Sequence, residues 1–319
     1  MTTKKINIGI SSCLLGEETR YDGDHSYAPE IVEAWDSAFS WISICPEVAI
    51  DLGVPRETID LVEVDNQIRL LRTNTRTDLT NRMNRFISRQ LTALDKQHLH
   101  GFVLRSKSPS CGLSRVPIEG ENGRVMHRRG QGMFAAALMK RFPFLPVAED
   151  GKLKTESARN NFLERVFAHQ RWTECVTCSK RKKAVVEFHN QHRIQLVAHG
   201  IGPLKQLDEL IANRKSLSPA RLKKNYGELF FRALERPVTP PRATVALRQV
   251  FRELKPVLHP KRKQIIENAI KDARNVDAPI SRPWGMLRHE LENHSLPGLF
   301  NQSWFQPSDS ELKLSWFGS

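Results

Sequence analysis

Apolar, β-branched runs alternate with stretches of helical character along the first half of the chain. Four runs predict buried strands: INIGIS (residues 6–11), FSWISI (39–44), HGFVLRS (100–106) and FLPVAED (144–150). Between them, PEIVEAW (29–35) and MFAAALMKRF (133–142) predict helices. Strands that alternate with helices predict an α/β, Rossmann-like domain with a mostly parallel sheet that is covered on both faces.

A longer amphipathic helix is predicted between the second and the third of these strands. Apolar residues recur there at helical spacing: Met83, Phe86, Ile87, Leu91 and Leu94. Asp78 and Thr80 stand at its predicted start, and the Thr80 hydroxyl is a suitable N-cap. The N–H groups of this first turn would also suit a cluster or a phosphate.

The second half of the chain has a helical pattern almost throughout. Residues 156–172 predict a helix that leaves the sheet domain, and breaks that contain Pro or Gly divide the rest into further helices. We therefore predict four parts: the α/β domain at residues 1–165, a basic linker at 166–184, a separate all-α domain at 185–305 and a tail at 306–319.

The chain of 319 residues has a net charge of +14, and the whole excess lies in its second half. Residues 1–150 hold 19 Lys and Arg and 19 Asp and Glu, whereas residues 151–319 hold 30 and 16. A neutral domain joined to a strongly basic one predicts that the second part binds a polyanion, with nucleic acid as the favoured candidate. The alternative is a basic surface that serves solubility, and charge alone does not distinguish RNA from DNA or from an anionic membrane.

Two further properties of the sequence concern its environment. No apolar stretch approaches the roughly 18 residues that a membrane span requires, and the first residues lack the long apolar region of a secretory signal. We expect a cytoplasmic, monomeric protein without membrane association. Five cysteines in such a chain predict reduced thiols rather than disulfides, and they favour metal binding or catalysis.

Three of the cysteines, Cys13, Cys45 and Cys111, stand shortly after predicted strands. The carboxyl ends of parallel strands meet at one edge of a sheet, where ligands usually bind in α/β domains. Gly, Pro and Ser surround these cysteines, and such loops expose side chains and bring N–H groups near the sulfurs. Three thiolates can hold an iron–sulfur cluster and leave one iron open as a Lewis acid. A structural zinc site needs a fourth ligand, so the pattern favours iron–sulfur over zinc and over a cysteine nucleophile.

Five motifs occur in an order and at a spacing typical of one family: SSCLLG (11–16), RYDG (20–23), CPE (45–47), DLT (78–80) and SPSCG (108–112). Over about residues 5–165 the chain resembles the bacterial 2-thiouracil desulfurase family. The resemblance implies a 4Fe-4S cluster held by Cys13, Cys45 and Cys111, with one iron that is not ligated by protein and takes the substrate sulfur. It also implies two catalytic residues, with Glu47 as the base for an attacking water and Ser108 as a hydrogen-bond donor or proton relay.

The second half resembles the helical domain of longer members of this family, in VEFHNQHRIQL (186–196) and KNYGELFFRAL (224–234). Such two-domain proteins are similar to the tRNA 4-thiouridine desulfidases. The resemblance implies thiolated tRNA as the partner and conversion of 4-thiouridine to uridine and sulfide. Two alternatives stay open: a desulfurase of free thiobases or thionucleosides such as 2-thiouracil, and a non-enzymatic RNA-binding protein with a structural metal.

Weaker candidates lie near these motifs. Tyr21 and Asp22 either line the site or shape a turn. Arg105, Lys107 and Arg115 flank the third cysteine, where positive charge would attract a substrate phosphate and favour a thiolate. Ordinary surface positions are the alternative for all three.

Cys175 and Cys178 form a C-x-x-C that the family pattern does not predict. They suit half of a zinc site with His169 or His189, a redox pair, or a chance feature of the linker. Basic residues follow them and recur in two further clusters, as candidate phosphate contacts or solvated helix faces. These are Lys180, Arg181, Lys182, Lys183, Arg221, Lys223, Lys224, Lys261, Arg262 and Lys263.

Overall fold

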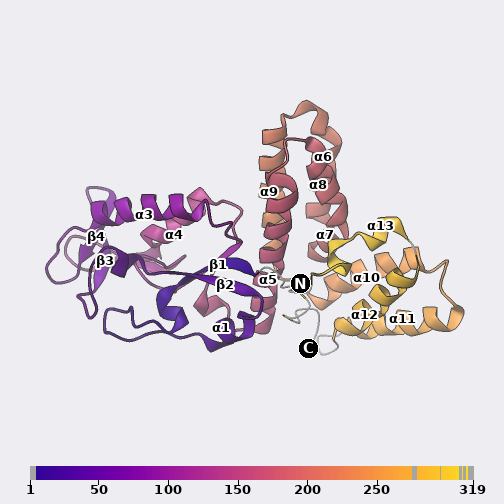
Figure 1. The fold of residues 1–319 in the computed structure, drawn as a ribbon, viewed down its shortest axis with the longest axis horizontal. Coiled ribbons are helices and arrows are strands. Elements are labelled where there is room, and N and C mark those ends of the chain that lie inside the picture. Colours follow the sequence, from indigo (N-terminus) through magenta and orange to yellow (C-terminus); the bar gives the residue numbers. More distant parts are fainter. Residues whose placement is uncertain (1–4, 275–278, 295, 309–310, 312–313, 315–319) are drawn as a thin grey trace. The chain divides into compact units, whose positions relative to one another are not determined.

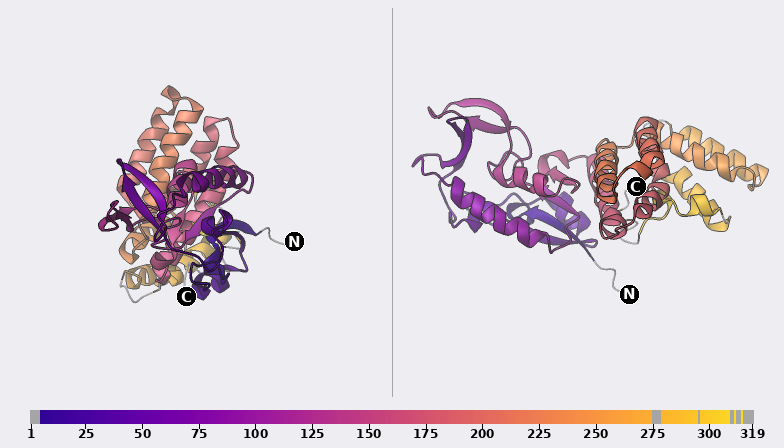
Figure 2. Two further views of the ribbon diagram at one scale, coloured as in Figure 1. Left: turned by 90° about the vertical axis from the view of Figure 1, so that its left-hand side faces the viewer. Right: turned by 90° about the horizontal axis from the view of Figure 1, so that it is seen from above.

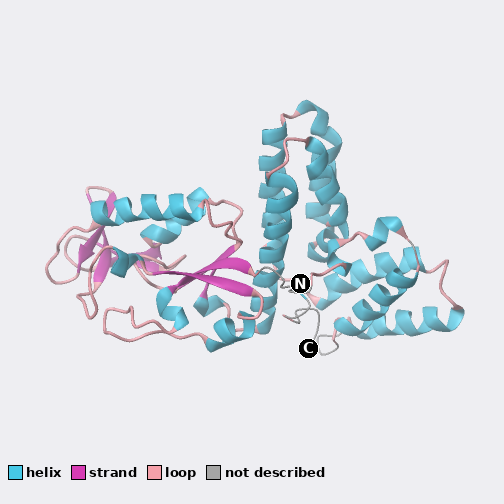
Figure 3. Cartoon of the chain, in the orientation of Figure 1, coloured by secondary structure: helices cyan, strands magenta, loops and turns pink. Residues whose placement is uncertain are grey.

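The computed structural model describes residues 5–274, 279–294, 296–308, 311 and 314. The chain divides into two compact units, Met1–Phe162 and Leu163–Ser319. The strands lie in the first unit, and the described part of the second consists of helices and loops (Figure 3). The predicted α/β domain followed by an all-α domain is therefore confirmed.

A four-stranded parallel sheet, sheet A, forms the centre of the first unit. Its strands are β1 (Ile6–Ser11), β2 (Phe39–Ile44), β5 (Gly101–Leu104) and β8 (Val147–Glu149), in the order β2-β1-β5-β8. All neighbouring pairs are parallel. These are the four strands that the apolar runs predict, and their carboxyl ends lie at one edge of the sheet.

Helices cover both faces of sheet A. α3 (Thr80–Leu94) and α4 (Met133–Arg141) lie on one face, and α1 (Pro29–Trp35) and the start of α5 (Glu156–Trp172) lie on the other (Figure 1). Three short helical segments follow strands of sheet A: Ser12–Leu15, Pro46–Ala49 (α2) and Asp150–Lys152.

Aromatic residues join the helices to the sheet. The Phe134 ring of α4 packs at 5.7 Å from Phe102 of β5 and at 6.4 Å from Phe86 of α3. Gly9 makes room for this packing, since a Cβ there would lie 2.3 Å from ring carbons of Phe102. Gly9 of β1 thus leaves space for the Phe102 ring on the neighbouring strand β5.

A second sheet, sheet B, was not predicted from the sequence. It contains β3 (Ile59–Val64), β4 (Gln67–Arg72), β6 (Val116–Glu119) and β7 (Val125–Gly130), in the order β4-β3-β6-β7. Two antiparallel hairpins, β3–β4 and β6–β7, meet through a parallel pairing of β3 with β6. Sheet A is thus wholly parallel, whereas sheet B is mixed.

The predicted N-cap of α3 is wrong. Thr80 is the first residue of the helix, and Leu79 occupies the N-cap without a side-chain hydrogen bond. The Thr80 N–H donates to Asp78 Oδ1 at 2.8 Å, and Thr80 Oγ1 accepts from the Leu70 N–H at 2.9 Å. The Thr80 hydroxyl therefore joins α3 to β4, because a backbone donor of the sheet takes the oxygen that would cap the helix, and Asp78 accepts from the first N–H of the helix.

The second unit is a helical assembly that continues from α5. Its further helices are α6 (Lys182–Gln191), α7 (Arg193–His199), α8 (Ile201–Ala212), α9 (Pro219–Leu234), α10 (Pro240–Leu254), α11 (Pro260–Asp272), α12 (Ser281–Asn293) and α13 (Pro297–Phe300). Prolines begin α9, α10 and α11, where the fixed φ of proline suits the first turn. α8 packs against α9, and α10 packs against α7, α11 and α12. Figure 2 shows the helices of this unit from two further sides. Short 3₁₀ turns lie at Asn213–Ser216 and Ser303–Phe305.

The segment predicted as a linker, residues 166–184, is mostly helical instead. It comprises the end of α5, the π-helical turn Thr173–Thr177 and the start of α6. Phe167, Trp172 and Val176 are buried in it, and Trp172 stacks on Tyr226 at 5.6 Å. These apolar side chains make the segment part of the helical core despite its charges.

The predicted tail, residues 306–319, lies largely outside the described residues. Within its described part, Glu311 is buried and pairs with Arg171. Among the helices that the structure describes, none has both the length and the apolar character that crossing a membrane would demand.

Candidate active site

A cavity of about 470 Å³ opens at the carboxyl edge of sheet A. Cys13 lies in the turn directly after β1, Cys45 joins β2 to α2, and Cys111 lies in the loop after β5. All three side chains line this one cavity, although they are up to 98 positions apart in the sequence. The structure therefore brings the three cysteines together, as the strand pattern predicts.

The environment of the three thiols disfavours their charged forms. Burial raises the pKa of Cys13 to about 11 and the pKa of Cys111 to about 12, and it also raises the pKa of Cys45. The charge of Glu47 acts in the same direction on all three pKa values. A bound cationic group would reverse this effect, because a metal-bound thiol is deprotonated. The donor set thus fits an iron–sulfur cluster, whose irons take Cys thiolates as ligands.

The spacing of the donors bears on the choice of metal. Among the residues that the structure describes, no three His, Cys, Asp or Glu side chains are grouped as they would be around one metal ion. Zinc binds its thiolates at about 2.3 Å and so needs such a group. A cluster distributes its ligands over separate irons, so it accepts cysteines that are further apart.

Helix α4 fixes the loop that carries Cys111. The Met133 and Phe134 N–H groups, at the start of α4, donate to the Pro109 and Ser110 carbonyls at 3.1 and 3.0 Å. The approach is close, since a Cβ at Gly132 would lie 2.5 Å from the Ser110 carbonyl carbon. The free N–H groups of the helix end therefore set the position of the loop.

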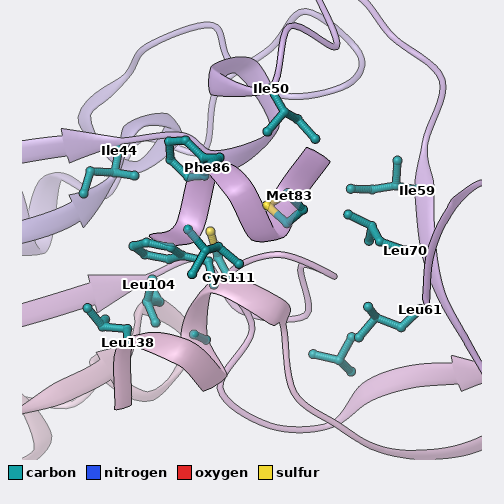
Figure 4. Close-up of a cluster of buried hydrophobic side chains, with 14 of the residues drawn as sticks. Ile44, Ile50, Ile59, Leu61, Leu70, Met83, Phe86, Leu104, Cys111 and Leu138 are labelled. Carbon is teal, nitrogen blue, oxygen red and sulfur yellow. The ribbon is translucent and has the colours of Figure 1, made fainter. Parts of the chain in front are cut away.

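Cys111 itself lies at the boundary between this loop and the core. It is 4% exposed and belongs to the same apolar cluster as Met83, Phe86 and Leu104 (Figure 4). Cys111 thus brings a thiol, which can ligate a metal, from the loop after β5 into this apolar cluster. The apolar surroundings give it a fixed position and little access to water.

Glu47, on α2, is held on both sides of its carboxylate. Oε2 accepts from Arg56 Nη2 at 2.8 Å and from Nε at 3.2 Å. Oε1 accepts from the Ser110 hydroxyl at 2.8 Å and from the Ser108 hydroxyl at 3.3 Å. All four residues line the cavity of the cysteines. The two predicted catalytic residues, Glu47 and Ser108, therefore lie together beside the predicted cluster ligands.

Ser108 also shapes its own loop. Its Oγ accepts from the Ser110 and Cys111 N–H groups, each at 3.2 Å, and lies 2.9 Å from the Ser110 Oγ. The turn role and the contact with Glu47 thus coexist in one side chain.

Sequence reasoning missed Arg56 and Ser110. Ser110 stands between Ser108 and Cys111, so its place in the SPSCG motif was an available signal. Arg56 carries no such signal, because it lies in a loop nine residues after Glu47 and outside all five motifs. Only the fold brings its guanidinium to the carboxylate.

Residues of sheet B and directly beside it form a further wall of the cavity. Thr58, Asp60, Thr73 and Glu119 line it there. Thr73 Oγ1 donates to Asp60 Oδ2 at 2.6 Å and lies 2.7 Å from Thr58 Oγ1. Burial, together with the charge of Asp60, raises the pKa of Glu119. This acidic wall adds two carboxylates and two hydroxyls to the lining, next to the apolar side chains of Ile59 and Leu61.

The weaker candidates divide into two groups. Tyr21, Arg105 and Lys107 line the cavity, and Arg105 pairs with Asp150. The second group does not line the cavity and contains Asp22, Asp78, Thr80 and Arg115. Asp22 pairs with Arg20 at 2.8 Å.

In the C-x-x-C of the second unit, Cys175 lies within the π-helical turn Thr173–Thr177 and Cys178 directly follows it. Both Cys175 and Cys178 are exposed free thiols. His189, one of the two suggested zinc partners, uses its ring nitrogens elsewhere: Nε2 lies 2.8 Å from Asp208 and Nδ1 lies 3.2 Å from the Tyr226 hydroxyl. The geometry gives no support to a zinc site that includes this histidine.

The predicted basic clusters are only partly available to a ligand. Lys182 Nζ donates to the Arg214 carbonyl at 3.0 Å, and Lys223 Nζ donates to the Thr177 carbonyl at 3.1 Å. Arg262 binds Glu290 at 2.6 Å. The exposed members are Lys180, Arg181, Lys183, Arg221, Lys224 and Lys261.

Both units of the chain have counterparts among known proteins. Residues 8–150 match the sequence model of the 2-thiouracil desulfurase family, and residues 193–308 match a family described as a protein of unknown function, DUF1722. The uncharacterized protein YbbK of Bacillus subtilis (strain 168) is 26% identical over 148 residues, which cover 44% of this chain and 94% of YbbK. A solved structure, the 4Fe-4S-dependent thiouracil desulfidase TudS, shares 28% identity and a TM-score of 0.39, over 47% of this chain and 93% of TudS.

The first unit thus contains a domain of the 2-thiouracil desulfurase family, and a helical DUF1722 domain follows it. The resemblance carried by the five motifs is confirmed, and so is the presence of an accompanying helical domain.

Proposed function

We propose that this chain is a cytoplasmic iron–sulfur desulfidase that converts 4-thiouridine in tRNA to uridine and sulfide without net redox change. The observation that carries the proposal is the position of Glu47. Its carboxylate lies in one cavity with three cysteines and is fixed by Arg56 on one oxygen and by serine hydroxyls on the other. A fixed carboxylate beside soft ligands suits the hydrolysis of a C=S bond.

The cysteines and the carboxylate divide the work. Cys13, Cys45 and Cys111 would hold a 4Fe-4S cluster with one iron that is not ligated by protein. When bound, this group supplies a soft Lewis acid for the thiocarbonyl sulfur. Glu47 supplies the base, which is typically worth about 10²- to 10⁴-fold in rate.

The proton balance follows from the contacts of Glu47. Its Oε1 accepts a proton from a water that attacks C4 of the pyrimidine. The C4–O bond forms, the C4–S bond breaks, and both protons of the water leave with the sulfur as hydrogen sulfide. The hydroxyls of Ser110 and Ser108 both contact Oε1 and each other, so they can relay the proton from Glu47.

The acidic wall supports a nucleoside rather than a free base as the reacting group. Asp60 and Glu119 of sheet B line the cavity with carboxylates. Carboxylates accept hydrogen bonds from hydroxyl groups. A ribose supplies such hydroxyls, whereas a free thiobase has only its ring N–H groups to donate to this wall. The cavity volume also lies within the range of small-molecule sites that enclose most of a ligand.

The charge of the second half supports RNA as the carrier of that nucleoside. The residues after 150 carry 30 Lys and Arg against 16 Asp and Glu. Phosphate neutralisation by such residues drives RNA binding. A free base has no phosphate groups, so its binding would not require these positive charges.

The test is turnover by protein reconstituted anaerobically with iron and sulfide. We expect tRNA that contains 4-thiouridine to yield uridine and sulfide in equal amounts. Glu47→Gln should keep its iron and lose about 10²- to 10⁴-fold in rate. Full turnover by iron-free protein would overturn the proposal, and iron-free protein that binds RNA without turnover would favour a non-enzymatic RNA-binding role.

A second candidate function is the desulfuration of free thiobases such as 2-thiouracil. The description of the matching family favours it. Parallel assays with 2-thiouracil, 4-thiouridine and thiolated tRNA separate the two candidates. Comparable kcat/KM for the base and the tRNA would favour the free base.

A further inference from the structure

An open groove lies beside α3 on the first unit, separate from the cavity of the cysteines. Arg82, Arg85 and Arg89 line it, and all three are exposed. Their spacing of three and four residues puts them on one face of α3. Met83 and Ile87, on the other side of the helix, are buried. We call this feature the arginine groove.

The groove is rich in hydrogen-bond donors. Asn81, Asn84 and Ser88 line it along with the arginines. Of the described residues in the lining, only Asp51 is acidic, and its carboxylate binds Arg82 at 2.8 Å. The groove therefore has an excess of positive charge, although the first 150 residues together are neutral.

The groove and the candidate active site share helix α2. Ala49 and Asp51 line the groove, and they follow Glu47 by two and four residues. α2 also contacts α3 directly. A polyanion that lies in the groove is thus held next to the cavity that contains Glu47.

The chemistry of the lining favours phosphate groups. A guanidinium presents a planar fork of donors that binds phosphate oxygens bidentately. Arg82 and Arg89 are seven residues apart, which corresponds to about 10 Å along a helix. This length covers more than one phosphate of a nucleic-acid strand.

We propose that the arginine groove binds backbone phosphates of the RNA substrate, next to the nucleotide that enters the cavity. This inference rests on the proposed function, since it assumes an RNA substrate. It gives the desulfurase domain its own RNA contact, in addition to the basic second unit.

The test is tRNA binding and turnover by the reconstituted full chain with Arg82→Gln, Arg85→Gln and Arg89→Gln combined. KM for tRNA that contains 4-thiouridine should rise about tenfold, and the slope of log affinity against log salt should become shallower by about 2. Turnover of the free nucleoside 4-thiouridine should stay unchanged, which also shows that the variant is folded. The single variants, each with a slope change of about 0.7, keep the test valid if the triple variant does not fold.

Two further variants sharpen the result. The control combines Arg124→Gln, Arg128→Gln and Arg129→Gln, which removes three exposed arginines of the β6–β7 hairpin region outside the groove. It should have a smaller effect on the salt slope. Asp51→Asn removes the one carboxylate of the lining and should tighten tRNA binding.

The outcomes separate the two proposals. If the wild-type protein neither binds nor converts tRNA, the proposed function fails and this inference fails with it. If the wild-type protein converts tRNA but the groove variants keep its affinity and salt slope, this inference alone is wrong.

Discussion

The guanidinium of Arg56 holds one oxygen of the Glu47 carboxylate with two N–H donors. Nη2 and Nε lie 2.8 and 3.2 Å from Oε2, and the Arg56 side chain is only 3% exposed. Arg56 also donates to the carbonyls of Gly53 and Thr19, at 3.0 and 2.8 Å, so its own position is fixed. Oε1 of Glu47 therefore faces Ser110 and is the oxygen in position to accept a proton. We regard Arg56 as a positioning residue.

Arg56→Gln should lower kcat for 4-thiouridine about 10- to 100-fold and leave KM nearly unchanged. A hydrogen bond to a charged group is worth about 1.5–3 kcal/mol, and its loss frees the carboxylate to leave its place. Single-turnover kinetics on reconstituted protein measure this effect.

The Glu47→Gln background provides the control. In this background Arg56→Gln should reduce the remaining rate very little, because Arg56 acts by positioning the Glu47 carboxylate and the Gln side chain cannot serve as the base. Equal losses in both backgrounds would show that Arg56 matters only for the stability of the loop.

Ser110→Ala should reduce turnover while the bound iron is retained. Its hydroxyl makes the shorter of the two serine contacts to Glu47 Oε1, at 2.8 Å against 3.3 Å for Ser108. We therefore expect a loss at least as large as that of Ser108→Ala. Ser114→Ala, in the same loop but outside the cavity lining, is the matched control and should behave as wild type. Wild-type kcat in Ser110→Ala would exclude a role in proton transfer.

Asp60→Asn should discriminate between nucleoside and base. The Asp60 carboxylate faces the cavity from sheet B and accepts a hydrogen bond from Thr73. If the ribose lies on this wall, kcat/KM for 4-thiouridine falls about tenfold, since a hydrogen bond typically contributes about 1 kcal/mol or somewhat more. The rate with free 4-thiouracil should stay constant. Glu63→Gln, on the same strand but outside the lining, serves as the control.

The stability of the second unit should fall at acidic pH because of His192. Burial, reinforced by the charge of Arg171 and by His189, lowers the pKa of His192 from 6.5 to about 3, and its Nδ1 donates to the Phe188 carbonyl at 2.7 Å. Between these pH values the unfolded chain binds a proton that the folded chain does not. The contribution of the neutral His192 ring to the free energy of unfolding is therefore complete above pH 6.5. It decreases as the pH falls towards 3, by up to about 1.4 kcal/mol per pH unit.

Urea unfolding followed by helical circular dichroism at several pH values measures this slope. His192→Gln should reduce it, whereas His259→Gln, at an exposed position, should not. An unchanged slope in His192→Gln would contradict the assignment.

Sheet A and its helices were predictable because each strand and helix has its own local pattern. Buried parallel strands give continuous apolar runs, and α3 shows a clear apolar stripe. The β3–β4 hairpin of sheet B has a local signal in the sequence as well. Asp65 and Asn66, both at positive φ, form a tight turn of the kind that favours these residues. By contrast, β7 is mostly exposed, so no apolar pattern marks it.

The candidate site was predictable only where a motif marks it. The three cysteines, Glu47 and Ser108 lie in motifs, and the topology of sheet A explains why they meet. Arg56 and the Asp60 wall depend on tertiary packing between a loop, sheet A and sheet B. The arginine groove was hidden for a different reason, because a count of charges over 150 residues averages it with acidic loops elsewhere.

The iron content of reconstituted cysteine variants tests the central claim most directly. The account predicts about four irons per chain in the wild-type protein, since one 4Fe-4S cluster binds. It predicts loss of this iron in Cys13→Ala, Cys45→Ala and Cys111→Ala, and full iron in the double variant Cys175→Ala with Cys178→Ala. Full iron in any of the three single variants, or its loss in the double variant, would contradict the account.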